Sequence, residues 1–211
     1  MTKSWIFDFD GTLVDSKENI LECYEYVTRK LVPERIKFIK NIIIGPSLNE
    51  TVSNLLGRNY IQYKKEFIEM FVEKHDTNII KNTKPYPHVN EILEKLRKNN
   101  DLIAIATNKR VKPTMKLINH YGWSKYFKYI ECSDSKKKIR GKTEMIEDII
   151  KKNKIFNESF FVGDTISDGL AAYENKIKFI FANYGYGKIN EQQNIYIYKN
   201  ICCIKKLSSL H

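Results

Sequence analysis

Residues 1–16 read MTKSWIFDFDGTLVDS. The continuous apolar run Trp5-Ile6-Phe7 predicts a strand that is buried on both faces of a sheet. Two aspartates one residue apart, Asp8 and Asp10, end this run. Carboxylates this close repel, and each raises the pKa of the other unless a cation or a reaction separates them. The pair therefore predicts either a turn, in which the side chains bond to the backbone, or part of a functional site.

Strand-length apolar runs recur along the chain, at residues 5–9, 102–106, 127–130, 160–162 and 178–181. Segments with helical periodicity separate the later runs, as in the stripe formed by Val89, Ile92, Leu93 and Leu96. Buried strands that alternate with helices predict an α/β fold, with a Rossmann-like parallel sheet flanked by helices.

Residues 16–84 interrupt this alternation, because they contain helical patterns and no comparable strand run. We expect a first helix through Ile20 and Leu31, a second over 34–40, a third from Ser47 to Leu56 and a longer one over 63–81. This helical segment is too long for a crossover loop. It predicts an inserted cap domain over 16–84, in a core domain made of 1–15 and 85–211.

Polar side chains follow several of the predicted strands, at the sheet edge where ligands of parallel sheets bind. Thr107 and Asn108 follow the second run, and Asp164 and Asp168 follow the fourth. Lys142 begins the helix before that fourth strand. Carboxylate oxygens without a histidine or cysteine cluster suit a hard cation such as Mg²⁺. A hydroxyl and a lysine beside them suit a phosphate group.

Each of these residues also has a purely structural interpretation. Asp168 is placed to cap a helix, and Lys142 follows a lysine-rich surface stretch, Lys136-Lys137-Lys138. The order of the whole set along the chain favours a site.

Four segments resemble, in order, the motifs of the haloacid dehalogenase superfamily: DFDGTLVDS (8–16), ATNK (106–109), GK (141–142) and VGDTISDGLAA (162–172). The phosphoglycolate phosphatase-like branch, which has a small helical cap, is also similar at IIGPSL (43–48), KPYPHVNEILEKL (84–96), YFKYIECSD (126–134) and FANYGYG (181–187). Two departures are Pro87-His88, where this branch often has proline-glycine, and the absence of a proline shortly after Lys142.

The resemblance implies a role for each matching residue. Asp8 would attack phosphorus, and Asp10 would protonate the leaving oxygen and then activate water. Mg²⁺ would be held by Asp8, the backbone carbonyl of Asp10, Asp164 and Asp168. The phosphoryl group would be bound by Thr107, Asn108 and Lys142. The second aspartate favours phosphoryl transfer, because the dehalogenases of the superfamily lack it.

The resemblance thus implies a Mg²⁺-dependent phosphatase that acts on small phosphate monoesters through a phospho-aspartate on Asp8. Phosphoglycolate, pyrophosphate, a nucleotide or a sugar phosphate are all open as substrates. A phosphomutase that uses the same phospho-aspartate is the first alternative. The residues 45–48, Gly-Pro-Ser-Leu, are the part of the cap that we expect to face the site.

The formal net charge of +11 raises a more distant alternative, an anion- or nucleic-acid-binding protein. No aromatic residues are interleaved in the densest basic run, 135–142, so we expect no nucleic-acid partner. No stretch approaches the ~20 apolar residues of a membrane span, and the N-terminal run has no cleavage site. We therefore expect no membrane partner and a cytoplasmic location, with Cys23, Cys132, Cys202 and Cys203 as reduced thiols. The sequence leaves the oligomeric state open.

Overall fold

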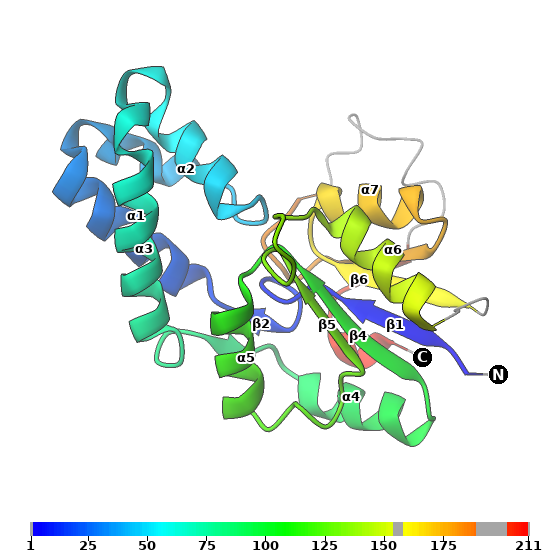
Figure 1. Cartoon of the computed structure of the whole chain (residues 1–211). Coiled ribbons are helices and arrows are strands. Elements are labelled where there is room, and N and C mark those ends of the chain that lie inside the picture. The colour runs from blue at the N-terminus through cyan, green and yellow to red at the C-terminus, as the bar shows by residue number, and fades with distance from the viewer. Residues whose placement is uncertain (1, 154–157, 189–201, 211) are drawn as a thin grey trace.

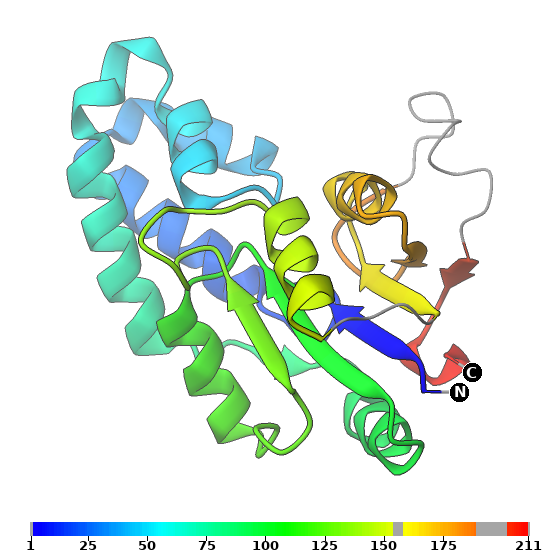
Figure 2. The same ribbon diagram turned by 45° about the vertical axis from the view of Figure 1, so that its right-hand side comes forward.

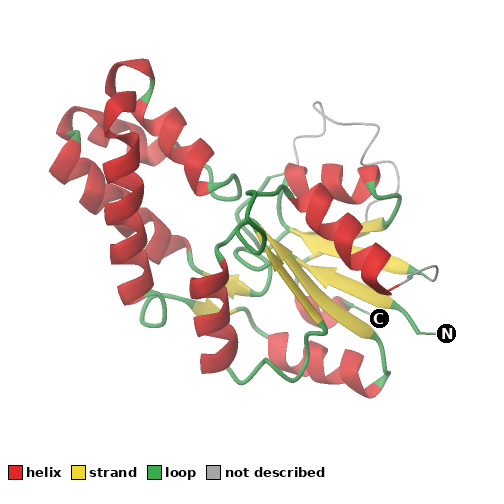
Figure 3. Cartoon of the chain, in the orientation of Figure 1, coloured by secondary structure: helices red, strands yellow, loops and turns green. Residues whose placement is uncertain are grey.

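The computed structural model describes residues 2–153, 158–188 and 202–210. A lobe of helices, built from the chain between β2 and β3, stands beside a sheet that has helices on both faces (Figure 1). The same two parts are seen in Figure 3, where the strands gather in one layer and the lobe on the left is entirely helical.

The sheet has the strand order β5-β4-β1-β6-β7-β8, and every pair of neighbours is parallel. Its strands are β1 (Ser4–Phe7), β4 (Leu102–Thr107), β5 (Tyr129–Cys132), β6 (Ser159–Gly163), β7 (Lys178–Ala182) and β8 (Cys202–Ile204). This confirms the predicted α/β class. β5 begins two residues later than the apolar run at 127–130, because Phe127 and Lys128 belong to the loop that precedes the strand.

The strands β1, β4, β6 and β7 each contribute apolar side chains to two separate cores. In β1, Trp5 and Phe7 pack with α4 and α5, whereas Ile6 packs with α6 and α7. The covering helices are α4 (Val89–Lys98), α5 (Val111–His120), α6 (Lys142–Asn153) and α7 (Ile166–Glu174), with a short 3₁₀ turn, η3 (Leu207–Ser209). Figure 2 shows the helices on the two sides of the strands. Burial on both faces explains why the strands read as continuous apolar runs.

The helical lobe has its own core, in which Tyr24, Val27, Leu56, Phe67 and Phe71 are buried. Its elements are α1 (Lys17–Leu31), η1 (Pro33–Asn41), α2 (Leu48–Leu56), η2 (Arg58–Tyr63) and α3 (Lys64–Asn78). The helix expected over 34–40 is a 3₁₀ segment with no fully buried residue, so apolar burial does not select an α-helix there. The helix expected to reach residue 81 ends at Asn78.

Two short strands carry the chain into and out of the lobe. β2 (Val14–Asp15) pairs antiparallel with β3 (Lys84–Pro85), so the two crossings lie side by side. His88 then begins α4 with φ 68°, in the left-handed region that favours glycine. The departure at Pro87-His88 thus places a histidine at a backbone position that suits the glycine of the related motif.

Cys23 and Cys132 are buried, free thiols, as expected; the side chain of Cys202 lies outside the described residues. In the part of the chain that the structure describes, no helix combines the length and the apolar character that crossing a bilayer would require.

Candidate active site

The carboxyl ends of β4, β1 and β6 meet at the middle of the sheet. After β1 the chain builds β4 and β5 on one side of β1, and then crosses to build β6, β7 and β8 on the other side. Ligands of open parallel sheets bind at such a switch point. The backbone of Asp8 extends β1 toward this edge, since its N–H donates to the Val162 carbonyl (2.9 Å). After Asp8 the chain turns sharply, and the N–H groups of Leu13 and Val14 both donate to the Phe9 carbonyl (2.9 and 3.0 Å).

Three carboxylates and one ammonium group converge at this edge. Asp8, Asp164 and Asp168 are buried and each offers an oxygen within 4.8 Å of the others. The Nζ of Lys142 lies 3.0 Å from Asp8 Oδ1 and 2.5 Å from Asp168 Oδ1. The structure therefore brings together four of the residues that the sequence analysis selected.

Local backbone features position each member of this acidic cluster. Asp164 follows β6 directly, and a Cβ atom on Gly11 would overlap its carboxylate, so only glycine allows the two loops to approach this closely. Asp168 forms a capping box with Thr165 at the start of α7: its Oδ2 accepts from Thr165 N (2.9 Å) and Oγ1 (2.6 Å). Its helix-capping and cluster roles coexist, because Oδ1 is the atom that meets Lys142.

The cluster fits a divalent cation. Asp164 Oδ2 accepts from the backbone N–H of Tyr186 (2.7 Å), but its buried Oδ1 has no hydrogen-bond partner. Burial raises the pKa of Asp8 to about 8, an effect that Lys142 opposes and that Asp168 and Asp164 reinforce. Burial and then Asp168 raise the pKa of Asp164 to about 6. One lysine therefore leaves negative charge uncompensated, and an oxygen-ligated cation such as Mg²⁺ would compensate it.

Lys142 stays charged in these surroundings. Burial lowers its pKa, but the carboxylates of Asp168 and Asp8 together hold that pKa above its ordinary value.

Asp10 lies outside the acidic cluster, on the side of the site toward the helical lobe. Lys109 Nζ lies 3.0 Å from both of its carboxylate oxygens, and Ser16 Oγ donates to Oδ1 (2.5 Å). The hydroxyl of Tyr186 accepts from Ser16 N (2.7 Å), so the segment that touches Asp164 also contacts the residues around Asp10. Lys109 and Ser16 together hold the carboxylate of Asp10 in one orientation.

Thr107 ends β4 and Asn108 follows it, and both line the same pocket as Asp8. Thr107 Oγ1 accepts from Lys109 N (3.2 Å), so the hydroxyl proton can still be donated to a ligand. Asn108 Nδ2 donates to the carbonyl of Gly45 in the lobe (2.8 Å). In this structure the amide of Asn108 thus joins the core to the lobe.

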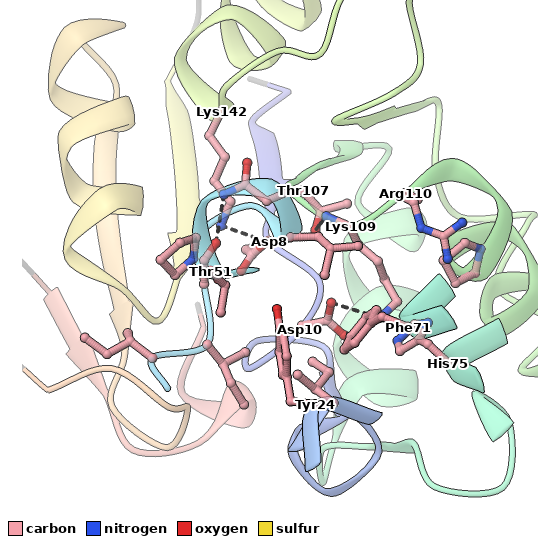
Figure 4. A pocket seen from close by; sticks show the side chains of 18 residues that line it. Asp8, Asp10, Tyr24, Thr51, Phe71, His75, Thr107, Lys109, Arg110 and Lys142 are labelled. Carbon is pink, nitrogen blue, oxygen red and sulfur yellow. Dashed lines mark hydrogen bonds and ion pairs between the residues drawn. The ribbon is translucent and has the colours of Figure 1, made fainter. Parts of the chain in front are cut away.

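A cavity of about 90 Å³ opens beside Asp8 and Asp10, with room for several water-sized groups. Figure 4 shows Asp8 and Lys142 at one end of the site, and Tyr24, Phe71 and His75 near Asp10. Gly45, Pro46 and Leu48 also line it, which agrees with the expectation that this turn faces the site.

Several residues that line this pocket were not predicted from the sequence, namely Tyr24, Thr51, Phe71, His75, Lys109 and Arg110. Lys109 and Arg110 directly follow Thr107-Asn108, so their position after a predicted strand could have indicated that they lie at the site. The residues from the lobe have no such signal, because Tyr24 and Phe71 belong to apolar stripes that equally predict a core.

The model of the haloacid dehalogenase-like hydrolase family matches residues 5–182 of this chain. The chain belongs to this family. All seven predicted site residues fall within the matched range.

Relatives named as phosphatases are similar along most of this chain. A phosphoglycolate phosphatase of Aquifex aeolicus is 28% identical, over 89% of this chain and 87% of its own length. A pyrophosphatase of Listeria monocytogenes is 25% identical, over 77% and 75%. A haloacid dehalogenase-like family hydrolase of Streptococcus pneumoniae has the same fold, with a TM-score of 0.80 and 20% identity over 99% of this chain and 96% of that one.

Proposed function

We propose that this protein is a Mg²⁺-dependent phosphatase that hydrolyses small phosphate monoesters through a phospho-aspartate on Asp8. The observation that carries the proposal is the buried cluster of Asp8, Asp164, Asp168 and Lys142 at the carboxyl ends of β1 and β6. Relatives named phosphoglycolate phosphatase and pyrophosphatase support small phosphate compounds as the substrate class.

In the first step, a carboxylate oxygen of Asp8 attacks phosphorus and forms an O–P bond while the bond from phosphorus to the leaving oxygen breaks. Asp10 donates a proton to that leaving oxygen, and the alcohol is released. Lys142 and Thr107 bind the oxygens of the transferred phosphoryl group, so negative charge that spreads over them is met by a fixed ammonium and a hydroxyl.

In the second step, water attacks the phosphorus of phospho-Asp8. Asp10, now ionised, takes a proton from this water, the bond from phosphorus to Asp8 breaks, and inorganic phosphate leaves. Asp8 is regenerated as a carboxylate and Asp10 as an acid. Lys109 and Ser16 hold the Asp10 carboxylate, which suits a group that has to face the leaving oxygen and later the water.

Asp8, Asp164, Asp168 and the carbonyl of Asp10 would hold Mg²⁺. When bound, the ion neutralises charge on the phosphoryl oxygens and keeps Asp8 ionised.

We also propose that residues 16–84 act as a cap that moves on the β2–β3 crossing and covers the bound ester. Among the described residues that line the pocket, those from the cap include no lysine or arginine. A phosphomutase has to hold the second phosphate of its intermediate while that intermediate reorients in the site. A cap wall without cations offers no partner for such a phosphate, which supports hydrolysis over the mutase alternative. Action in the cytoplasm remains part of the proposal.

The test is phosphate release from a panel of monoesters and pyrophosphate, each with Mg²⁺ and with EDTA. We expect Asp8→Asn to lose at least about 10³-fold in turnover, because an amide cannot act as the nucleophile. Asp134→Asn is the matched control: this exposed residue accepts from Val111 N (2.7 Å), a bond that an amide oxygen preserves. An Asp8→Asn protein that retains turnover would contradict the phospho-aspartate mechanism.

A further inference from the structure

The wall of the pocket that faces a bound leaving group is apolar and carries no net charge. We infer that the preferred substrate is the phosphate ester of an uncharged alcohol with an apolar or aromatic part, rather than a phosphate whose leaving group is itself an anion. This inference rests on the proposed phosphatase function and narrows its substrate class.

The cap contributes mostly hydrocarbon to the cavity. Ile20 and Tyr24 come from α1, Ile44 precedes the turn at Gly45, Leu48 begins α2 and Phe71 comes from α3. Thr51, His75 and the hydroxyl of Tyr24 are the polar groups that the described part of the cap adds to this lining. His75 is buried, stacks on Phe71 at 5.6 Å between ring centroids, and has its pKa lowered to about 4 by burial, so it is neutral at physiological pH.

Each of the three cations among the described lining residues already has a carboxylate partner. Lys142 pairs with Asp8 and Asp168, and its place in the cluster assigns it to the phosphoryl end. Lys109 holds both oxygens of Asp10 at 3.0 Å. Neither is available to a charged group at the far end of the substrate.

Arg110 is the remaining cation, and it forms an ion pair with Asp76 of α3. Asp76 is held further by Lys112 Nζ at 3.7 Å and by His75 Nδ1 at 3.4 Å. Although burial raises the pKa of Asp76, its bonds to His75 and Arg110 lower it to about 2, so the carboxylate stays charged. A leaving-group carboxylate would have to displace Asp76 before it could pair with Arg110.

The rim of the pocket is apolar, like its wall. Ile43 lines the pocket and is 73% exposed, the largest exposed fraction among the exposed large hydrophobic side chains of the described residues. An apolar leaving group would cover this side chain and Ile44, which is favourable because apolar area is removed from water. An anionic leaving group would lose hydration at the same wall without gaining a partner.

The experiment compares kcat/KM for phosphoglycolate, propyl phosphate and 2-phenylethyl phosphate with saturating Mg²⁺. Phosphoglycolate and propyl phosphate are similar in length and differ in the terminal carboxylate. We expect 2-phenylethyl phosphate to be preferred over phosphoglycolate by about tenfold or more, with propyl phosphate between them.

Two variants make the comparison independent of the intrinsic reactivity of each ester. Ile43→Lys adds a cation at the rim of the pocket, and we expect it to shift the ratio about tenfold toward phosphoglycolate. Ile61→Lys is the matched control, since Ile61 is also an exposed isoleucine of the cap (45% exposed) but does not line the pocket. We expect the control to leave the ratio unchanged.

The outcomes separate the two proposals. Phosphate release that favours phosphoglycolate over both uncharged esters in the wild type, or a ratio that Ile43→Lys does not move, overturns the inference about the leaving group and leaves the phosphatase function standing. Failure to release phosphate from all three esters and from acetyl phosphate, with Mg²⁺ present and the protein folded, overturns the proposed function and the inference with it.

Discussion

Asp164 has one carboxylate oxygen bonded to the Tyr186 backbone and a second, Oδ1, that is buried without a partner. Its neighbours Asp8 and Asp168 add like charge, and Lys142 compensates only part of it. A buried carboxylate oxygen without a partner lowers the stability of the fold unless a ligand or ion binds to it. The carboxylate oxygens that destabilise the metal-free protein are thus the same atoms that would bind a metal ion.

We predict that Mg²⁺ raises the melting temperature of the wild-type protein but not that of Asp164→Asn. At ten times its dissociation constant, a ligand that binds only the folded state stabilises it by about 1.4 kcal/mol, which corresponds to about 3–6 °C for a protein of this size. A thermal melt with and without Mg²⁺ measures the shift. The amide of the variant can still accept from Tyr186 N, so its fold should be retained; an equal Mg²⁺ shift in the variant would remove Asp164 from the metal site.

Lys109 orients Asp10, and we predict that Lys109→Met lowers kcat by about 10–100-fold with a smaller change in KM. The variant keeps the length of the side chain but removes both 3.0 Å contacts to the carboxylate, which then relies on Ser16. Steady-state kinetics on the best ester checks this. Lys138→Met is the control, because Lys138 is 85% exposed and lies outside the pocket. A loss confined to KM would assign Lys109 to substrate binding.

Single elements of the fold also carry part of the site. The capping box of Thr165 and Asp168 begins α7 and at the same time directs Asp168 Oδ1 toward Lys142, which begins α6. The first turns of the two helices therefore meet, and the N-terminal positive end of each helix dipole adds to the stabilisation of negative charge there.

The left-handed backbone of His88 gives a prediction about the element α4. A histidine at φ 68° is strained, whereas glycine adopts this conformation without a Cβ conflict. We expect His88→Gly to raise the free energy of unfolding by about 0.5–1 kcal/mol, because relief of this strain exceeds the added entropy of the unfolded chain. Urea denaturation measures it. Asn100, at φ 57°, is the comparison: Asn100→Gly should gain less, because asparagine tolerates the left-handed region. Equal gains at both positions would contradict the argument.

The relation between cap and core is a property of the whole molecule. On one side of the pocket, Asn108 donates to Gly45, and on the other, Asp76 of α3 pairs with Arg110 and accepts from Lys116 through its backbone carbonyl (2.9 Å). The β2–β3 crossing forms the third connection. Polar contacts of this kind exchange readily with water, which is compatible with the proposed movement of the cap.

His75 makes the stability of this assembly depend on pH. Burial lowers its pKa from 6.5 to about 4 in the folded protein. Between these values the unfolded chain binds more protons, so the free energy of unfolding falls as the pH falls, by up to about 1.4 kcal/mol per pH unit. Asp8 and Asp164 act in the opposite sense in metal-free protein, because their pKa values are raised in the folded state. The folded protein then binds more protons than the unfolded chain, so their contribution to the free energy of unfolding falls as the pH rises.

A comparison of variants isolates the histidine. We predict that His75→Phe, which preserves the stack on Phe71, removes this part of the pH dependence between about pH 6.5 and 4, whereas His120→Gln, at an exposed site, leaves it unchanged. Urea unfolding at a series of pH values provides the slopes. Parallel curves for wild type and His75→Phe would show that His75 does not remain neutral in the fold.

Much of the fold and the acidic part of the site could be predicted from sequence, for reasons that are local. The runs at Trp5–Phe7 and at 102–106 are short and apolar, so they specify buried strands, and polar residues after parallel strands must lie at one edge. Asp8, Thr107 and Asp164 were found in this way. The length of 16–84 without a strand run indicated an insertion, although the 3₁₀ form of Pro33–Asn41 was not foreseeable because apolar spacing alone does not distinguish it from an α-helix.

The sequence by itself therefore determined the class of fold, the order of five strands of the sheet and the carboxylates at the strand ends, because these depend on side-chain periodicity and on the geometry of parallel sheets; the short strands β2, β3 and β8 were not predicted. Only the tertiary structure decided which partner each charge meets. Lys109 bonds to Asp10, and Arg110 to Asp76 of the cap, although the two cations are adjacent in the chain. The apolar wall formed by Tyr24 and Phe71 likewise arises where three helices pack, and the spacing of apolar residues in the sequence does not predict it. Pairing and pocket shape depend on contacts between residues far apart in sequence, which periodicity does not encode.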